Sequence, residues 1–254
     1  MDSDPASLRG RIGEATGRLA TTADGLTDGQ AREPSRLPGW TRGHVLAHLA
    51  RNADGLRNLL IWARTGVPTA QYPSQEAREA GVEDGAGRPA AKLAEDLRQS
   101  AAAFAREAAG VPAGSWTAMV RGINGPEHPA WFTLFRRLGE VEIHHVDLDA
   151  GYGPPDWPVP FVADQLEQVT GQFAHRDEVP PCLLEVAETG QRLVLGPPGA
   201  PGRAREGEVT VSGPGGWMLA WLIGRDPGRG LTVRTGREPA DGGGALPPKL
   251  PNWS

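Results

Sequence analysis

Two stretches decide how this chain is interpreted: Leu37-Pro-Gly-Trp-Thr-Arg-Gly-His-Val-Leu-Ala-His48 and Glu140-Val-Glu-Ile-His-His-Val-Asp147. Each carries two metal-binding residue types four positions apart. On an α-helix that spacing is about one turn, so Glu140 and His144 project from one face and can bind the same ion. With His48 as a third ligand, two packed helices would form an open zinc site with one position left for water, a thiolate or substrate.

A hydrogen-bonded network competes with this metal site as an explanation. In that alternative Glu140 orients His144 inside a buried polar cluster and no ion is bound. Two further histidines remain open: His44 contacts substrate or orients a ligand, whereas His145 lies about 100° further round the helix and is expected to be a packing or surface residue.

Composition narrows the possible partners. The chain has 254 residues and a formal net charge of −5, and its basic residues are interspersed with acidic ones. No basic run is long enough to follow a phosphate backbone, so we expect no nucleic-acid partner. There is no apolar run of about eighteen residues and no signal-peptide pattern at the start, which predicts a cytoplasmic protein with no membrane partner. Because no long heptad pattern is present, we expect a monomer.

One cysteine, Cys182, is present, so no disulfide can form within the chain. It begins an apolar segment with no cationic neighbour, and is therefore expected to be a small buried residue. Any thiol used in a reaction would then come from outside the protein.

Apolar residues recur with helical spacing through the first 152 residues, which predicts an N-terminal helical domain. Thr41 is a suitable N-cap for the helix that carries His48. Four long helices, two of them bearing histidines, favour an antiparallel four-helix bundle, in which metal sites form between facing helices. The four predicted helices are 6–26, 41–65, 90–109 and 130–148. A short helix is expected within 72–88, a loop over 27–40, and a loop or short extended piece over 112–129.

A Pro-rich segment, Gly153-Pro-Pro-Asp-Trp-Pro-Val-Pro160, marks the domain boundary. The pattern changes after it to short strands between helices, which predicts a small C-terminal α+β domain over 153–238, followed by a flexible tail over 239–254. The overall fold class is therefore α+β. The expected elements are helices 161–173 and 216–223 and strands 183–186, 192–195, 208–212 and 231–234.

The two histidine stretches, together with Trp221-Leu-Ile-Gly-Arg225, resemble mycothiol-dependent maleylpyruvate isomerase, within the DinB-like metalloenzyme superfamily. The resemblance covers nearly the whole chain. It implies a DinB-like four-helix N-terminal domain, a smaller α/β C-terminal domain, and zinc held by His48, Glu140 and His144. The arginine that the family places near the metal falls on Arg225.

The resemblance also implies an activity, the conversion of maleylpyruvate to fumarylpyruvate with mycothiol as a catalyst that returns unchanged. Zinc, or another divalent metal, suits this chemistry because it keeps a bound thiol ionised or polarises a substrate carbonyl. Arg225 would bind a carboxylate of the dicarboxylate substrate in a cleft between the domains. From the sequence alone, Arg225 is better explained as an arginine at a helix C-terminus that interacts with the helix dipole, and the resemblance reverses that preference.

Two other functions remain open. A mycothiol S-transferase would use the same metal site but leave the thiol attached to an electrophilic xenobiotic or biosynthetic intermediate. A non-catalytic binding module or regulator would use the histidines structurally and hold no metal. The residues that bind mycothiol are not identified by the sequence, although Arg42 and Asn52 are candidates for its groove.

Overall fold

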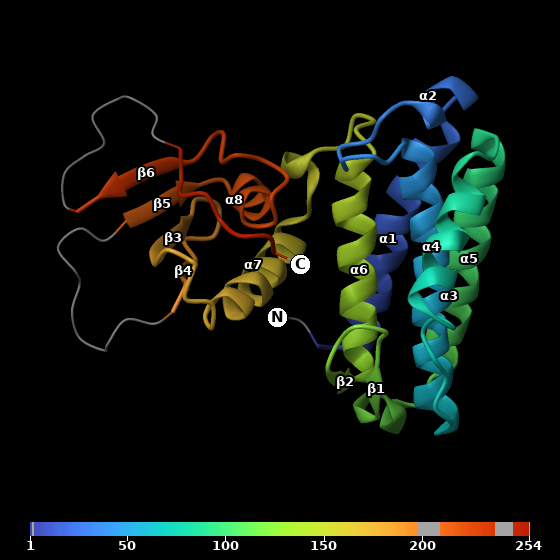
Figure 1. Ribbon diagram of the computed structural model, residues 1–254. Helices are drawn as coiled ribbons and strands as arrows, with labels where there is room; N and C mark the ends of the chain where they lie inside the picture. Colours follow the sequence, from blue (N-terminus) through green and yellow to red (C-terminus); the bar gives the residue numbers. More distant parts are fainter. Residues whose placement is uncertain (2, 198–208, 237–245, 254) are drawn as a thin grey trace. The chain divides into compact units, whose positions relative to one another are not determined.

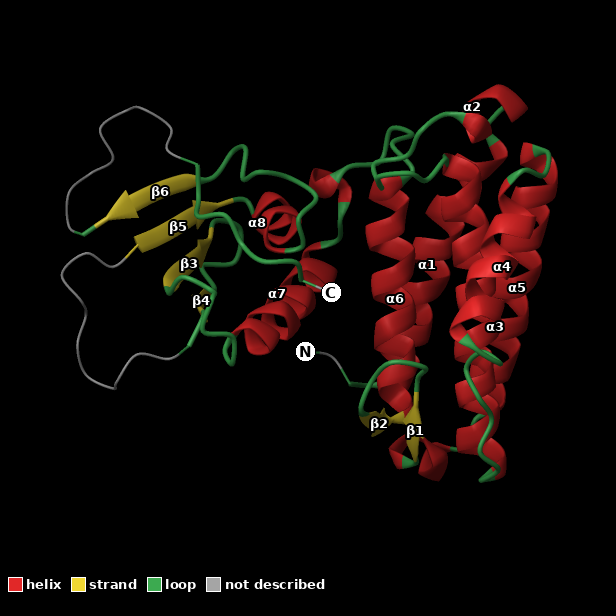
Figure 2. Cartoon of the chain, viewed as in Figure 1, coloured by secondary structure: helices red, strands yellow, loops and turns green. Residues whose placement is uncertain are grey.

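The computed structural model describes residues 1, 3–197, 209–236 and 246–253. It divides into two compact units, Asp2–Tyr152 and Gly153–Ser254, the second of which includes Met1. The division falls at the start of the Pro-rich segment. The α+β class predicted from the sequence is confirmed, since the first unit is mainly helical and the second combines helices with a sheet (Figure 2).

Four long helices form most of the N-terminal unit (Figure 1). Helix α1 contacts α5 and α6, and α3 contacts the same two, so the four enclose a common apolar core. The four helices predicted from the sequence are confirmed, with ends shifted by only a few residues. Their bounds are α1 Pro5–Asp24, α3 Arg42–Thr65, α5 Ala90–Gly110 and α6 Ala130–Asp147.

The helices form because their apolar residues line one face, and a side chain caps the first turn of α1 and of α3. On α1 the buried residues Leu8, Ile12, Ala15, Leu19 and Ala23 recur at steps of three and four, which is the spacing of a single helical stripe. The carboxylate of Asp4 accepts a hydrogen bond from the Ser7 backbone N–H at 2.9 Å and so caps the helix.

Short elements occupy 27–40, which was predicted as a loop, and 112–129, which was predicted as a loop or a short extended piece. Residues 27–40 contain α2 (Asp28–Arg32), because Thr27 and Gln30 form a capping box that stabilises a single short turn of helix. The segment 112–129 contains the short 3₁₀ helix η1 (Ala113–Thr117) and a hairpin of β1 (Met119–Arg121) and β2 (Glu127–Pro129). The expected short helix is confirmed as α4 (Gln75–Ala86).

The C-terminal unit is a mixed four-stranded sheet with helices beside it. The strand order is β4-β3-β5-β6; β3 and β5 are parallel, and the two outer pairs are antiparallel. Helix α7 contacts β4 and α8, and α8 contacts β5. The elements are η2 Pro154–Asp156, α7 Val159–Phe173, β3 Cys182–Val186, β4 Arg192–Leu195, β5 Val209–Gly213, α8 Gly215–Leu222 and β6 Thr232–Thr235.

Alternation along β3 explains how this sheet is buried. Cys182, Leu184 and Val186 face the core, whereas the two residues between them are partly accessible, as the two-residue period of a strand requires. Leu184 lies opposite Val211 of β5, and both are fully buried. Residues 239–245 and 254 of the predicted flexible tail lie outside the described residues, and 246–253 have no regular secondary structure.

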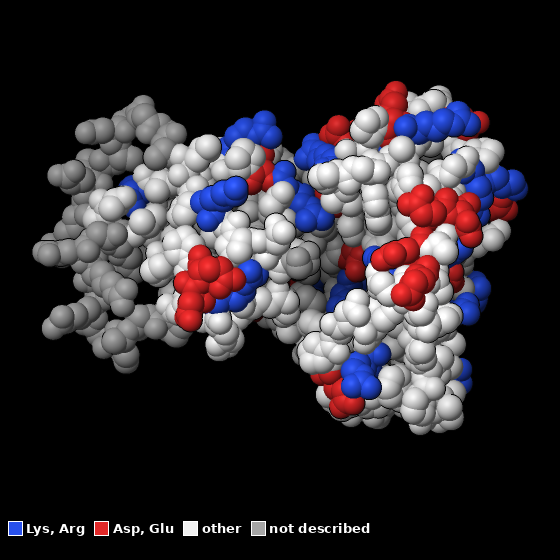
Figure 3. Space-filling view, viewed as in Figure 1, with Lys and Arg blue, Asp and Glu red and all other residues white. Residues whose placement is uncertain are grey.

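The distribution of surface charge and the character of the helices both concern possible binding partners. In the space-filling view, acidic and basic side chains are interspersed on the visible face (Figure 3). Among the described residues, no helix combines the length and apolar character needed to cross a bilayer.

Close packing of α3 against α4 gives a test of this fold. A Cβ placed on Gly43 would lie well inside van der Waals contact of the Ala86 carbonyl oxygen. We expect Gly43→Ala to lower the free energy of unfolding by about 1–3 kcal/mol, because the α4 backbone must move. Urea denaturation measures this change.

Gly17 provides the matched control, because it lies on an exposed position of α1 and a Cβ there would meet no atom within 4 Å. Gly17→Ala should raise the stability by about 0.5–1 kcal/mol through helix propensity alone. Equal effects of the two substitutions would contradict the close approach of α3 and α4.

Candidate metal centre

His48 is placed by the capped start of α3. The Thr41 side chain accepts a hydrogen bond from the His44 backbone N–H, and the His44 ring returns a contact to the Thr41 backbone at 3.2 Å, which completes a capping box. His48 follows one turn later and is only 4% exposed. The ring of Trp40 packs against it with a centroid separation of 5.5 Å.

Glu140 and His144 lie one turn apart on α6 and face His48 across the helix pair. Glu140 Oε2 is 3.0 Å from His48 Nε2 and 3.3 Å from His144 Nε2. One ligand atom from each of the three residues lies within 4.8 Å of the other two. The structure therefore brings together the three residues that the sequence singled out as metal ligands.

Asp147 holds the ring of His144 from its other side. Its Oδ2 atom is 2.9 Å from His144 Nδ1, and its side chain is fully buried. A histidine with Nδ1 bonded to a carboxylate presents Nε2 in a fixed direction, which is the usual outer support of a metal-bound histidine. Asp147, on the same helix as Glu140 and His144, thus has a structural role in orienting His144.

The electrostatics of the cluster follow from its burial and its pairs. Burial opposes ionisation of Glu140, but hydrogen bonds from His144 and His48 hold the pKa of this carboxyl well below its ordinary value. Burial also lowers the pKa of His48. For His144 burial acts in the same direction, yet Asp147 and Glu140 outweigh it and raise its pKa to about 9. At neutral pH the cluster thus combines the ionised carboxylate of Glu140, the neutral imidazole of His48 and the protonated imidazole of His144, which Asp147 stabilises.

The two histidines left open by the sequence lie outside this cluster. His44 serves the capping box, and its Nε2 is 3.4 Å from Glu83 Oε2. His145 is buried, stacks on Tyr152 with ring centroids 3.8 Å apart, and lies 2.8 Å from the Thr22 hydroxyl. The expectation that His145 is a packing residue is confirmed for its buried ring.

Arg137 is a residue whose importance the sequence analysis missed. It is fully buried on α6, one turn before Glu140, and its Nη1 donates to the Leu49 carbonyl at 2.9 Å and to Asn52 Oδ1 at 2.8 Å. Asn52 is buried in this contact. The signal in the sequence was the three-residue spacing of Arg137 and Glu140, but spacing alone does not show burial.

Arg42 also has structural partners. Its guanidinium donates to the carbonyls of Leu148 and Asp149 at 2.7 and 2.9 Å and pairs with Glu33. These bonds join the start of α3 to the segment that follows α6. They account for Arg42 without a role in binding a thiol.

Arg225 follows α8 in the C-terminal unit. Its Nη1 donates to the Ile223 carbonyl at 3.0 Å, and its backbone N–H donates to the Ala220 carbonyl at 2.7 Å. These bonds match the helix C-terminal arrangement that was the alternative for this residue. The three candidate ligands belong to the other unit.

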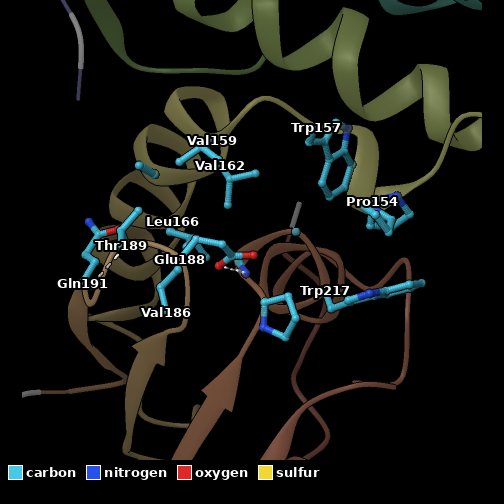
Figure 4. Close-up of a pocket in the computed structure, with 15 residues that line it drawn as sticks. Pro154, Trp157, Val159, Val162, Leu166, Val186, Glu188, Thr189, Gln191 and Trp217 are labelled. Atoms are coloured by element: carbon cyan, nitrogen blue, oxygen red, sulfur yellow. Dashed lines mark hydrogen bonds between the residues drawn. The ribbon is translucent and has the colours of Figure 1, made fainter.

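A separate pocket lies within the C-terminal unit (Figure 4). It has a volume of about 250 Å³ and a mainly apolar lining that includes Trp157, Val162, Leu166 and Trp217. The acidic group in it, Glu188, accepts a hydrogen bond from the Gly215 backbone N–H at 2.9 Å. Neither the three candidate ligands nor Arg225 line this pocket.

Cys182 is unsuited to nucleophilic chemistry at neutral pH. Its side chain is buried in β3, and burial raises the pKa of its thiol to about 11. The prediction of a small buried residue is confirmed.

The contact between Asp147 and His144 gives a testable prediction. We expect Asp147→Asn to weaken zinc binding about tenfold, because the outer carboxylate no longer orients the ring or supports its basicity. It should also lower the pKa of His144 in the metal-free protein. Competition with a chelator measures the first effect and an NMR titration of the ring measures the second; an unchanged zinc affinity would contradict the assignment.

Comparisons with known proteins agree with this geometry. A family model described as the mycothiol maleylpyruvate isomerase N-terminal domain matches residues 12–149, which include all three candidate ligands. A search of curated protein sequences found no match.

Two solved structures resemble the whole chain. One is the crystal structure of a mycothiol-dependent maleylpyruvate isomerase, with a TM-score of 0.85 and 26% identity over 98% of this chain and 97% of the other. The second, a histidine-to-alanine mutant of a protein with that name, has a TM-score of 0.84, the same identity and the same coverage. This chain therefore belongs to the mycothiol maleylpyruvate isomerase family.

Proposed function

We propose that the chain catalyses the mycothiol-dependent cis–trans isomerisation of maleylpyruvate to fumarylpyruvate, with a zinc ion or another divalent metal held by His48, Glu140 and His144. The observation that carries the proposal is the convergence of these three side chains in a member of this family. The helical unit around them is then a DinB-like antiparallel four-helix bundle, and the C-terminal unit is the smaller α/β domain of the same enzyme.

The donor set fits a catalytic metal site. Two imidazoles and one carboxylate are a common set of protein ligands for an open zinc site, and the distances of 3.0 and 3.3 Å direct both Nε2 atoms to one carboxylate oxygen. A hydrogen-bonded network without an ion would contain the same contacts, so these distances alone do not distinguish it from a metal site. The outer carboxylate of Asp147 on His144 favours the metal, because it fixes the ring with Nε2 turned inward.

The reaction requires temporary loss of the double bond. A thiolate adds to one alkene carbon, a carbon–sulfur bond forms, and the π electrons move onto the conjugated carbonyl oxygen as an enolate. After rotation about the new single bond, the enolate electrons rebuild the double bond in the trans form and the thiolate leaves. No atom or electron is gained or lost, so the thiol acts as a catalyst.

The bound metal ion would supply the charge that keeps a thiol ionised at neutral pH or stabilises the developing enolate. The chain's own residues prepare the place for this chemistry. Glu140 stays ionised through its two histidine partners, Asp147 orients His144, and burial of His48 beside Trp40 excludes water from one side of the cluster. Each of these groups has a fixed partner within the protein, which would limit the reorganisation that the reaction requires.

We propose Arg225 as the residue that binds a substrate carboxylate. Its planar, positively charged guanidinium matches a carboxylate in geometry and in charge. The hydrogen bond from its Nη1 to the Ile223 carbonyl at the end of α8 would also hold the side chain in one orientation. In this proposal the helix-end contact and substrate binding are two roles of the same residue.

The test follows maleylpyruvate by ultraviolet absorbance with zinc-loaded protein, in the presence and absence of mycothiol. We expect formation of fumarylpyruvate only with mycothiol, and loss of both zinc and activity in His48→Ala. Arg225→Met should raise KM for maleylpyruvate and leave the bound zinc unchanged, because the residue acts on substrate.

His44→Ala is the matched control, since His44 lies one turn from His48 on the same helix but belongs to the capping box. We expect it to keep bound zinc and to lose about 1 kcal/mol of stability. Accumulation of a stable mycothiol adduct in place of fumarylpyruvate would overturn the isomerase in favour of S-transfer. Absence of bound metal in the wild type would overturn the metal site and favour a non-catalytic role.

A further inference from the structure

Arg137 is an unusual residue for the interior of a helical unit. Its side chain is fully buried, and it reaches from α6 to α3, where it bonds to the Leu49 carbonyl and to Asn52. Leu49 directly follows His48, and Arg137 lies one turn before Glu140. The guanidinium therefore joins the same two helix segments that supply the candidate ligands.

Hydrogen bonds do not satisfy this guanidinium. Within the described part of the chain, its Nε and Nη2 atoms are buried and have no hydrogen-bond partner. A buried, incompletely paired arginine is destabilising compared with an apolar residue of similar size. Burial lowers its pKa to about 10, so it remains protonated at neutral pH, and the nearby charge of Glu140 acts in the opposite direction. A fixed positive charge is therefore kept beside the cluster at a cost in stability.

The other charges around the cluster determine what the positive charge of Arg137 contributes. Glu140 and the buried Asp147 each contribute a negative charge, and the two histidines are neutral when they bind a metal. With a divalent ion present, these groups alone would give a neutral centre, and Arg137 leaves one net positive charge. Arg78 of α4 also acts on His48, and Asp54 of α3 acts on Arg137, but both are partly exposed and therefore screened by solvent.

We propose that Arg137 is a positioning residue that sets the charge of the metal centre and thereby selects an anionic ligand, such as a thiolate, at the open coordination position. This inference rests on the proposed metal site. An anion neutralises the remaining positive charge in a buried environment, where charge–charge interactions are strong. A neutral water or protonated thiol gains nothing comparable from the guanidinium.

The proposal makes opposite predictions for two measurements on one variant. In Arg137→Met we expect zinc to bind at least as tightly as in the wild type, because repulsion between the guanidinium and the cation is removed. The same variant should bind mycothiol about tenfold more weakly, because the anion loses its favourable partner. Chelator competition measures zinc binding. Titration of the cobalt-substituted full chain with mycothiol, followed by the thiolate-to-cobalt charge-transfer absorption, measures thiolate binding without turnover.

Two further variants separate charge from structure. Arg137→Lys keeps the positive charge and should recover most of the mycothiol affinity. Asn52→Asp keeps the hydrogen-bond acceptor for Arg137 but adds a negative charge that neutralises the guanidinium, so it should weaken mycothiol binding although Arg137 is intact. This variant tests the inference even if Arg137→Met does not fold. Arg64→Met is the matched control, because Arg64 lies on the same helix α3 and pairs with Glu107 instead. It should change neither measurement.

The outcomes are distinct. Wild-type mycothiol affinity in Arg137→Met or in Asn52→Asp would overturn the inference and leave the proposed function untouched. If Arg137→Met loses zinc binding and neither Arg137→Lys nor Asn52→Asp binds zinc, Arg137 has a purely structural role. That result would also overturn the inference. Failure of the wild type to bind metal would instead overturn the proposed function itself.

Discussion

The contact between His48 of α3 and Glu140 of α6 is the interaction on which the rest of the site depends. It brings two helices from distant parts of the sequence to a separation of 3.0 Å between polar atoms within an otherwise apolar interior. Groups of this kind are buried only when they are paired, because an unpaired charge in the interior is costly. Each further feature of the site supplies such a partner: His144 for Glu140, Asp147 for His144, and Asn52 for Arg137.

This arrangement also explains why the N-terminal unit is built as it is. Helix α3 is buried along most of its length, between α4, α5 and α6, so its start must be fixed accurately for His48 to face α6. The capping box of Thr41 and His44 defines that start, and the bonds of Arg42 to the segment after α6 anchor it. Stabilising contacts around the cluster thus offset the cost of its buried polar groups.

Much of this could be predicted from the sequence, and the remainder has physical reasons for escaping it. The long helices and the strands followed from hydrophobic periodicity, and the spacing of Glu140 and His144 placed them on one face. The short helix α2 was missed because a capping box of only four residues has no periodicity. The contact between Arg137 and Asn52 was not predicted because it joins two helices, and local spacing contains no information about contacts between helices. The place of Arg225 relative to the ligands depends on two separate units, which no local pattern describes.

The central claim, that His48, Glu140 and His144 together bind one metal ion, is tested most directly by X-ray absorption spectroscopy at the zinc edge of the zinc-loaded chain. The account predicts two imidazole nitrogens and at least one oxygen at about 2.0–2.2 Å. In Glu140→Gln the zinc affinity should fall steeply while the helical circular dichroism is retained. A spectrum without imidazole ligands, or undiminished zinc affinity in Glu140→Gln, would contradict the account.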